Sequence, residues 1–190
     1  HYAFIVVTDR AVMAELGELW REVVDTYRTL AGTAVPDFAD ERHTRMERAL
    51  AHQAAHFDDT PALVVACYRK DRPSASSLTD LRANVELVRH LGFRRIRRLA
   101  AGLRSSANLS EASSIYPAVQ NLLLAARANG LAANLTIWHI MNERGFRDVL
   151  GVPSDHGIYA LVPIGWPEGN FGPVRRRPVD EVRHRDRWGS

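Results

Sequence analysis

Three consecutive arginines, Arg175, Arg176 and Arg177, stand immediately before a proline near the end of the chain. A planar guanidinium group donates paired, charge-assisted hydrogen bonds to phosphate oxygens in a geometry that a lysine ammonium group does not reproduce. These side chains could therefore hold a phosphate group. The alternative is a solvated basic tail that binds nothing, and charge alone favours this alternative.

Histidine, serine and cysteine side chains offer other chemistries, but none of them forms a recognisable catalytic motif. His52 and His56 lie one helical turn apart, a spacing that can bind a metal ion. No glutamate follows His52 as in zinc hydrolases, and such a pair is usually only a polar helix surface. Ser113 and Ser114 have no base partner in a recognisable motif, and Cys67 in the apolar run PALVVACYRK is expected to fill the core. We therefore predict neither a metal site nor a catalytic side-chain nucleophile.

The composition is typical of a reduced, intracellular globular protein. The chain of 190 residues is long enough to bury a core and to enclose a cavity, and a single cysteine does not build a disulfide scaffold. No apolar stretch reaches the length of about 20 residues that a membrane span needs, and the N-terminus lacks the pattern of a signal peptide. We therefore predict a cytoplasmic location without membrane association.

The apolar periodicity predicts strands mixed with long helices. Four apolar runs are typical of strands: residues 4–7, 62–68, 131–138 and 157–167. Four segments have helical spacing: residues 10–30, 37–56, 114–130 and 142–153. Asp9 is the expected cap of the first helix, Asn108 or Ser110 that of the third, and Gly130 and Gly151 are expected to end the last two. Because strands and helices do not alternate as in a doubly wound fold, the pattern indicates the α+β class.

Residues 70–108 have a different character from the rest of the chain. A flexible connector, RPSASS, leads into one or two helices between Leu81 and Arg104, interrupted at Gly92. The polar face of this segment carries seven arginines against a single glutamate: Arg82, Arg89, Arg94, Arg95, Arg97, Arg98 and Arg104. Such a face could bind nucleic acid, but only Phe93 interrupts the basic run, and single-strand binders interleave several aromatic residues. We therefore predict no nucleic-acid partner.

The last third of the chain contains several motifs in a fixed order. They lie in "PAVQNLLLAARANGLAANLTIWH" and in "FRDVLGVPSDHGIYALVPIGWPEGNFGPVRRRPVDEVRH". This part resembles the FMN-dependent nitroreductase family. In that family a Gln-Asn-Leu helix, a Gly-Leu turn, a Leu-Gly-Val/Ile-Pro helix end, an Ile-Gly-Tyr/Trp-Pro strand and a terminal Arg-x-Pro follow one another. The resemblance covers Ser113 to Trp188 well and Tyr2 to about Cys67 loosely.

The resemblance implies a single nitroreductase-like domain over residues 1–190. Its expected fold is α+β, with a central mixed or antiparallel sheet flanked by helices, in a homodimer with an exchanged C-terminal tail. Trp188 would then anchor on the partner subunit, the alternative being a disordered end. The opening HYAFIVVTDR resembles a strand that is preceded by further sequence in the family, so we expect an N-terminal segment with an Arg-Ser-x-Arg motif to be missing. Residues 70–108 are not covered and are expected to form an insertion or lid.

The resemblance also implies an FMN site. Arg175 and Arg176 fall on the basic positions just before the family's proline and become the expected clamp for the flavin phosphate. Asn134, Leu135 and Thr136 resemble the segment that the family places along the flavin, where hydrogen bonds tune how easily the ring accepts a hydride. For each of these three side chains, a place in a plain edge strand is the alternative.

Three further residues near these motifs are expected to have other roles. Arg177 is expected to point to solvent. Asn121 lies among leucines in a predicted helix and is expected to be a structural amide with satisfied hydrogen bonds. His139 follows Trp138, and we expect it to cap the next helix rather than to contact a substrate.

The implied activity is that of an FMN-dependent oxidoreductase that needs no side-chain nucleophile. NADH or NADPH would pass a hydride to flavin N5, and a small acceptor such as a nitroaromatic or a quinone would then be reduced. Two alternatives remain at this point. One is a dehalogenase or flavin-fragmenting enzyme of the same family, and the other is a protein that binds or sequesters flavin without catalysis.

Overall fold

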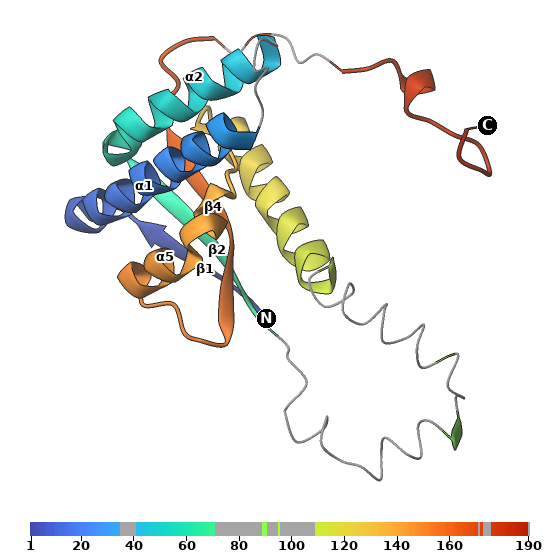
Figure 1. The fold of residues 1–190 in the computed structure, drawn as a ribbon, viewed down its shortest axis with the longest axis horizontal. Coiled ribbons are helices and arrows are strands. Elements are labelled where there is room, and N and C mark those ends of the chain that lie inside the picture. The colour runs from blue at the N-terminus through green and yellow to red at the C-terminus, as the bar shows by residue number, and fades with distance from the viewer. Residues whose placement is uncertain are drawn as a thin grey trace.

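The computed structural model describes residues 1–34, 41–70, 89–90, 95, 109–170, 172 and 176–189. Four strands form one sheet: β1 (Tyr2–Val7), β2 (Ala62–Arg69), β3 (Ala132–Ala133) and β4 (His156–Gly165). The helices are α1 (Arg10–Ala34), α2 (Glu41–His56), a helix over residues 109–128, and α5 (Glu143–Leu150). The described residues also form three short 3₁₀ helices: η1 (Phe57–Asp59), η2 (Trp138–Asn142) and η3 (Val179–Glu181). The α+β class is confirmed (Figure 1).

The sheet is antiparallel and has the order β1-β2-β4-β3. Strand β2 lies in the middle, and five consecutive residues, 63–67, are buried. This agrees with its unbroken apolar sequence, because a strand that is covered on both faces needs no polar alternation. The expectation of an antiparallel sheet is therefore confirmed. Helices pack against both faces of the two central strands, β2 and β4.

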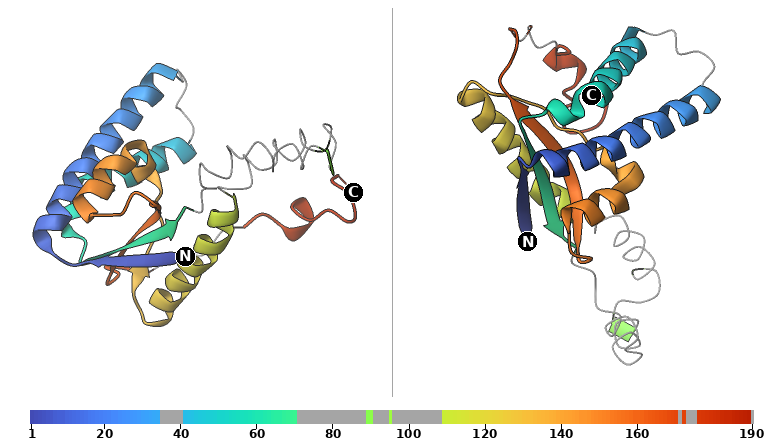
Figure 2. Two further views of the ribbon diagram at one scale, coloured as in Figure 1. Left: turned by 90° about the horizontal axis from the view of Figure 1, so that it is seen from below. Right: turned by 90° about the vertical axis from the view of Figure 1, so that its left-hand side faces the viewer.

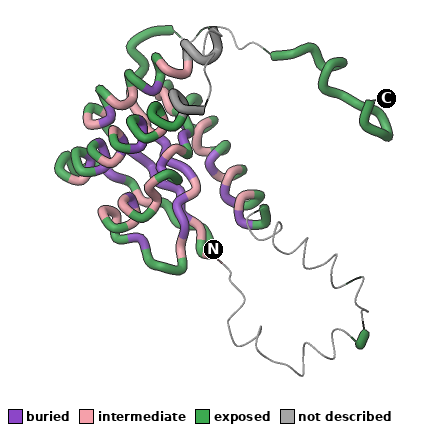
Figure 3. The backbone as a smooth tube through the Cα atoms, viewed as in Figure 1, coloured by how far each residue is buried: buried purple, intermediate pink, exposed green. Residues whose placement is uncertain are grey.

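Helices cover the two faces of the sheet unequally. On one face α1, α2 and α5 lie together, and on the other the helix over residues 109–128 is the one described helix (Figures 1 and 2). The larger core has these buried members among others: Met13, Leu16, Trp20, Val23, Leu50, Phe57, Leu63, Val65, Phe146 and Leu161. The smaller core consists of Val64, Ala66, Ile115, Val119, Ala160 and Val162. In Figure 3 the buried backbone accordingly follows the central strands and the sides of the helices that face them.

A bulge in β4 forms hydrogen bonds with two side chains of the helix over residues 109–128. The register between β2 and β4 shifts between Ala66 and Cys67, so that Tyr159 is an extra residue on the same face as Ala160. The Tyr159 hydroxyl donates to the buried carboxylate of Glu111, and the Tyr159 carbonyl accepts a hydrogen bond of 3.1 Å from the Tyr116 hydroxyl. The bulge thus provides polar partners for this helix in an otherwise apolar layer.

Several sequence-based expectations about helix ends are confirmed. The Asp9 carboxylate accepts hydrogen bonds from the backbone N–H groups of Ala11 and Val12, at 2.8 and 3.1 Å, and so caps α1. Gly151 ends α5 with a left-handed φ of 63°, a conformation that glycine adopts without steric cost. The expected cap Asn108 lies outside the described residues, as does most of the expected insertion at 70–108.

Other expectations were only partly correct. Helix α1 continues to Ala34 instead of ending at residue 30. The expected strand over residues 131–138 shrinks to Ala132–Ala133 and one isolated bridge between Thr136 and Leu161, because the chain then leaves the sheet edge and turns into η2. Asn121 is exposed, and its role as a structural amide stays a prediction.

Cys67 fills the core as predicted. The side chain is 2% exposed, and burial, with a smaller contribution from the charge of Glu143, raises the pKa of its thiol to about 11. A thiol with such a pKa is almost entirely protonated at neutral pH and is a poor nucleophile. A catalytic role for Cys67 is therefore not supported.

Candidate functional site

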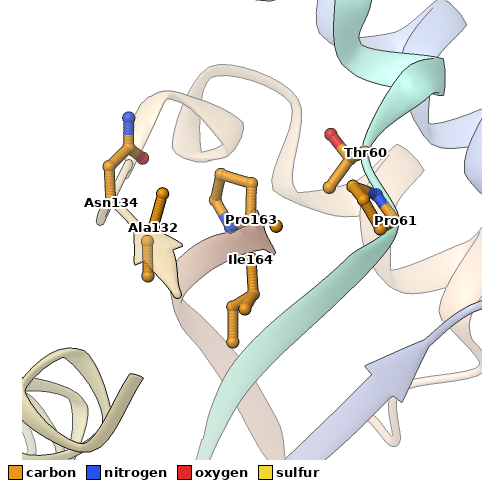
Figure 4. Close-up of a pocket in the computed structure, with 8 residues that line it drawn as sticks. Thr60, Pro61, Ala132, Asn134, Pro163 and Ile164 are labelled. Carbon is orange, nitrogen blue, oxygen red and sulfur yellow. The ribbon is translucent and has the colours of Figure 1, made fainter. Parts of the chain in front are cut away.

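Two adjoining pockets lie at the end of the sheet where β4 finishes and β2 begins. The first, which we call the sheet-end pocket, has a volume of about 330 Å³ (Figure 4). Thr60, Pro61, Pro163, Ile164 and residues 132–134 line it. The second, the histidine pocket, has a volume of about 170 Å³ and lies against α2. The two pockets share Thr60, Asn134 and Pro163, so they form one continuous candidate site.

Strand register brings the walls of the sheet-end pocket together. Ala62 pairs with Ile164 on one side of β4, and Ala133 pairs with the same Ile164 on the other side. The last residues of β4 therefore lie between the start of β2 and the short strand β3, as the close-up in Figure 4 shows. These walls are largely apolar, which suits a planar aromatic group better than a charged one.

The predicted cofactor residues are only partly brought together here. Asn134 lines both pockets. Thr136 lines the histidine pocket and is fixed by two backbone hydrogen bonds of 2.9 Å with Leu161. Leu135 is 38% exposed and belongs to neither lining. Arg176 lies in the exposed tail, also outside both linings, and Arg175 lies outside the described residues.

Helix α2 contributes residues to the histidine pocket that the sequence did not reveal as functional. His52, Gln53 and His56 line it, and the two imidazole rings lie 4.6 Å apart. The interpretation of this pair as a plain polar helix surface was therefore incomplete. The i, i+4 spacing was visible in the sequence, but nothing in the sequence showed that this face of α2 meets Asn134 and Pro163.

The inner wall of the histidine pocket contains an unused hydrogen-bond donor. Trp20 is fully buried and stacks on Phe57 with ring centroids 5.3 Å apart. Its indole Nε1–H has no hydrogen-bond partner among the described residues. Buried donors in native proteins almost always have a partner, because a lost hydrogen bond costs free energy. This N–H is itself enclosed by protein atoms, so it is an unsatisfied polar group of the core beside the pocket and not a donor that is open to the pocket.

His139 lines neither pocket and does not cap the next helix, so the expectation of a cap was wrong. The ring is fully buried, and Nε2 lies 3.0 Å from the Ile158 carbonyl oxygen. Because a carbonyl can only accept, Nε2 carries the proton. The cap of α5 is Asn142, whose side-chain oxygen accepts from the Gly145 N–H at 3.2 Å.

The burial of His139 predicts that the protein becomes less stable in mild acid. Desolvation lowers the pKa of the imidazole below its ordinary value of 6.5 in the folded state. As the pH falls below about 6.5, the unfolded chain binds a proton that the folded chain does not, so the free energy of unfolding decreases, by at most about 1.4 kcal/mol per pH unit from this group. Urea denaturation at pH 7 and pH 5.5 should show that this decrease is smaller in His139→Gln than in the wild type. An equal decrease in both proteins would contradict the assignment.

The chemistry of the candidate site is that of binding and orientation. Polar side chains surround the histidine pocket: the carboxamides of Gln53 and Asn134, the imidazoles of His52 and His56, and the hydroxyl of Thr136. Such groups can bind and orient a ligand through hydrogen bonds.

Two other kinds of feature are absent from the described part of the chain. There, no group of three or more His, Cys, Asp and Glu side chains is arranged to hold a metal ion. In the same part, no helix combines the length and apolarity that a bilayer crossing requires.

The chain resembles known proteins in sequence pattern and in fold. The sequence model of the nitroreductase family matches residues 2–166. The fold is similar to that of a BluB-like flavoprotein from Clostridium difficile 630, with 16% identity, 98% of this chain and 80% of the other covered, and a TM-score of 0.62.

Two further solved structures share the fold at low sequence identity. Iodotyrosine deiodinase bound to FMN and 3-iodo-L-tyrosine is 14% identical over all of this chain and 76% of the other, with a TM-score of 0.59. The NADPH:FMN oxidoreductase from Vibrio harveyi, complexed with NAD⁺, is 15% identical over all of this chain and 60% of the other, with a TM-score of 0.55. No curated protein sequence was found to match.

Proposed function

Because this chain belongs to the nitroreductase family, we propose that it is an FMN-dependent oxidoreductase that binds the flavin ring in the two adjoining pockets at the sheet end. The main support for the proposal is that Asn134 and Thr136 both line the candidate site. Both were expected along the flavin, and both line a cavity whose opposite wall is polar. Three solved structures of similar fold support this proposal: a flavoprotein, a deiodinase bound to FMN and an NADPH:FMN oxidoreductase.

The residues of the site fit the two unlike ends of a flavin ring system. The pyrimidine end has carbonyl oxygens and ring nitrogens, for which the carboxamides of Gln53 and Asn134 and the Thr136 hydroxyl are suitable partners. The dimethylbenzene end is apolar, as are Pro61 and Ile164 in the sheet-end pocket. Pocket walls of this kind fix orientation through a few polar groups and exclude water through the apolar ones.

The chemistry would come from the cofactor, and the protein would position the reactants. FMN, when bound, accepts a hydride at N5 from NADH or NADPH and passes electrons to an acceptor such as a nitroaromatic or a quinone. The phosphate clamp by Arg175 and Arg176, the insertion at 70–108 within one domain and a cytoplasmic location stay predictions.

We also propose that the protein acts as a homodimer. Tyr2, Phe4 and Val6 on β1 are 61%, 40% and 63% exposed and share the face of the sheet that the helix over residues 109–128 covers only in part. Leu124 on that helix is also exposed. Apolar residues gathered in this way mark an interaction surface, and Trp188, 92% exposed in the tail, is the proposed anchor on a second copy.

An absorbance spectrum of the purified full-length protein, before and after anaerobic addition of NADH or NADPH, tests the function. We expect a yellow flavin band that bleaches when the reductant is added. A flavin band that persists with both reductants would favour the alternative of a flavin-sequestering protein. A colourless protein that also fails to take up added FMN would contradict the proposal.

A dehalogenase is the second candidate, because the deiodinase bound to FMN and 3-iodo-L-tyrosine shares the fold over the whole of this chain. Reductive removal of a halide and reduction of a nitro group both draw electrons from the flavin, so the fold does not decide between them. Halide release from a halogenated aromatic substrate by the reduced protein would support this candidate. Reduction of nitroaromatics without halide release would support the first.

A further inference from the structure

One imidazole of the histidine pocket is paired with a carboxylate. His56 is the last residue of α2, and its Nδ1 lies 2.9 Å from Asp59 Oδ2 on the following η1 turn. A carboxylate accepts only, so in this contact Nδ1 carries the proton. The second ring nitrogen, Nε2, is then the one that remains for a ligand, and His56 lines the histidine pocket. Carboxylates commonly orient imidazoles in this way and stabilise the imidazolium when it forms.

The surroundings of His56 allow its charge to change. Its side chain is 55% exposed, so protons exchange freely with solvent. Among the described groups, His52 on α2 and Asp59 on η1 contact it, and Asp58 on the same η1 turn binds the Arg10 and Arg21 side chains of α1. Arg10 donates to the Thr60 carbonyl and Arg21 pairs with Asp58 at 3.3 Å, so both arginines already have partners beside the pocket.

We propose that His56, oriented by Asp59, takes up the proton that balances the negative charge which the bound flavin gains on reduction. This inference rests on the proposed function. A hydride brings two electrons and one proton, so the ring system gains one negative charge when the hydride is transferred. A proton from solvent on His56 Nε2 offsets that charge and gives the imidazole of this pocket-lining residue a second N–H donor. A preorganised donor at the place where charge develops stabilises that charge.

The proposal predicts that His56→Gln weakens the preference of the protein for reduced flavin. Glutamine retains hydrogen-bonding groups but cannot take up a proton, so the variant separates charge from hydrogen bonding. We expect the ratio of reduced to oxidised FMN affinity to fall about tenfold, which corresponds to a midpoint potential about 30 mV lower for a two-electron couple. Spectroelectrochemical titration of the FMN-loaded full-length protein at pH 7 measures this potential, and direct titration measures the affinity for oxidised FMN.

The chain provides a matched control in a second histidine and aspartate pair. His156 Nδ1 lies 2.8 Å from Asp155 Oδ1 at the start of β4, away from both pocket linings. His156→Gln should leave the potential unchanged. Asp59→Asn, an exposed substitution that leaves His56 in place, should lower the potential in the same direction but by less.

An unchanged potential in both His56→Gln and Asp59→Asn, with oxidised FMN still bound, would overturn this inference and leave the proposed function intact. A shift of the same size in His156→Gln would also overturn it, because the effect would then be nonspecific. Failure of the unaltered protein to bind FMN would overturn both the proposed function and this inference.

Discussion

Replacing Phe146 with alanine is expected to lower the free energy of unfolding by about 3–5 kcal/mol. Helix α5 has eight residues, all described, and Phe146 is the one among them that is buried. A helix of this length is not stable in isolation, so it depends on its packing against the rest of the protein. The ring is fully buried in the larger core and contacts His139 edge to face, with centroids 6.1 Å apart. Truncation to alanine removes these contacts and leaves a cavity that the surrounding side chains fill only partly.

Urea denaturation followed by far-UV circular dichroism measures this loss, and Arg144→Ala on the same helix is the matched control. The Arg144 side chain is 94% exposed, and its nearest carboxylate, on Asp148, lies 3.8 Å away on an exposed surface. Surface ion pairs of this kind contribute little, so the denaturation midpoint of the control should stay at the wild-type value. Equal midpoints for Phe146→Ala and the wild type would show that α5 does not depend on this side chain.

Local sequence patterns were sufficient to predict most of the fold. The apolar run of β2, the helical spacing of α1 and the cap at Asp9 are each decided by neighbouring residues, and each is confirmed. The length of the strand after Gly130 was not predictable in this way. Its pairing depends on where β4 ends, because β3 pairs with Ile164 and Gly165 at the end of that strand.

The candidate site was less predictable than the fold, because its walls come from segments far apart in the chain. Asn134 and Thr136 were found through an ordered motif around them. Gln53 and His56 have no such motif, and they meet Asn134 only because α2 packs beside the end of the sheet. The buried Trp20 is similar, because no sequence pattern shows that an indole N–H lacks a partner. The type of a residue in the sequence could suggest which hydrogen bonds its side chain can make. Which of these residues line the same cavity depends on tertiary packing.

Replacing both Arg175 and Arg176 with alanine is expected to weaken FMN binding by at least about a hundredfold. A flavin phosphate carries close to two negative charges, and each hydrogen bond between charged partners contributes about 1.5–3 kcal/mol, so the loss of two such contacts accounts for this factor. Isothermal titration of the full-length protein with FMN measures the change. Riboflavin, which lacks the phosphate, should bind the wild type and the variant equally well, because the clamp acts on the phosphate alone.

The tail itself supplies the control for a general effect of positive charge. Arg183 and Arg185 lie in the same exposed segment, and their nearest acidic neighbours, Asp180 and Asp186, lie 2.7 and 3.9 Å away. Replacing both with alanine removes the same number of charges without touching the Arg-x-Pro motif. If this control loses as much FMN affinity as the first variant, the tail attracts the cofactor only through its overall charge. If the control binds as the wild type does and the first variant does not, Arg175 and Arg176 act through specific contacts, and these two arginines are part of the cofactor site.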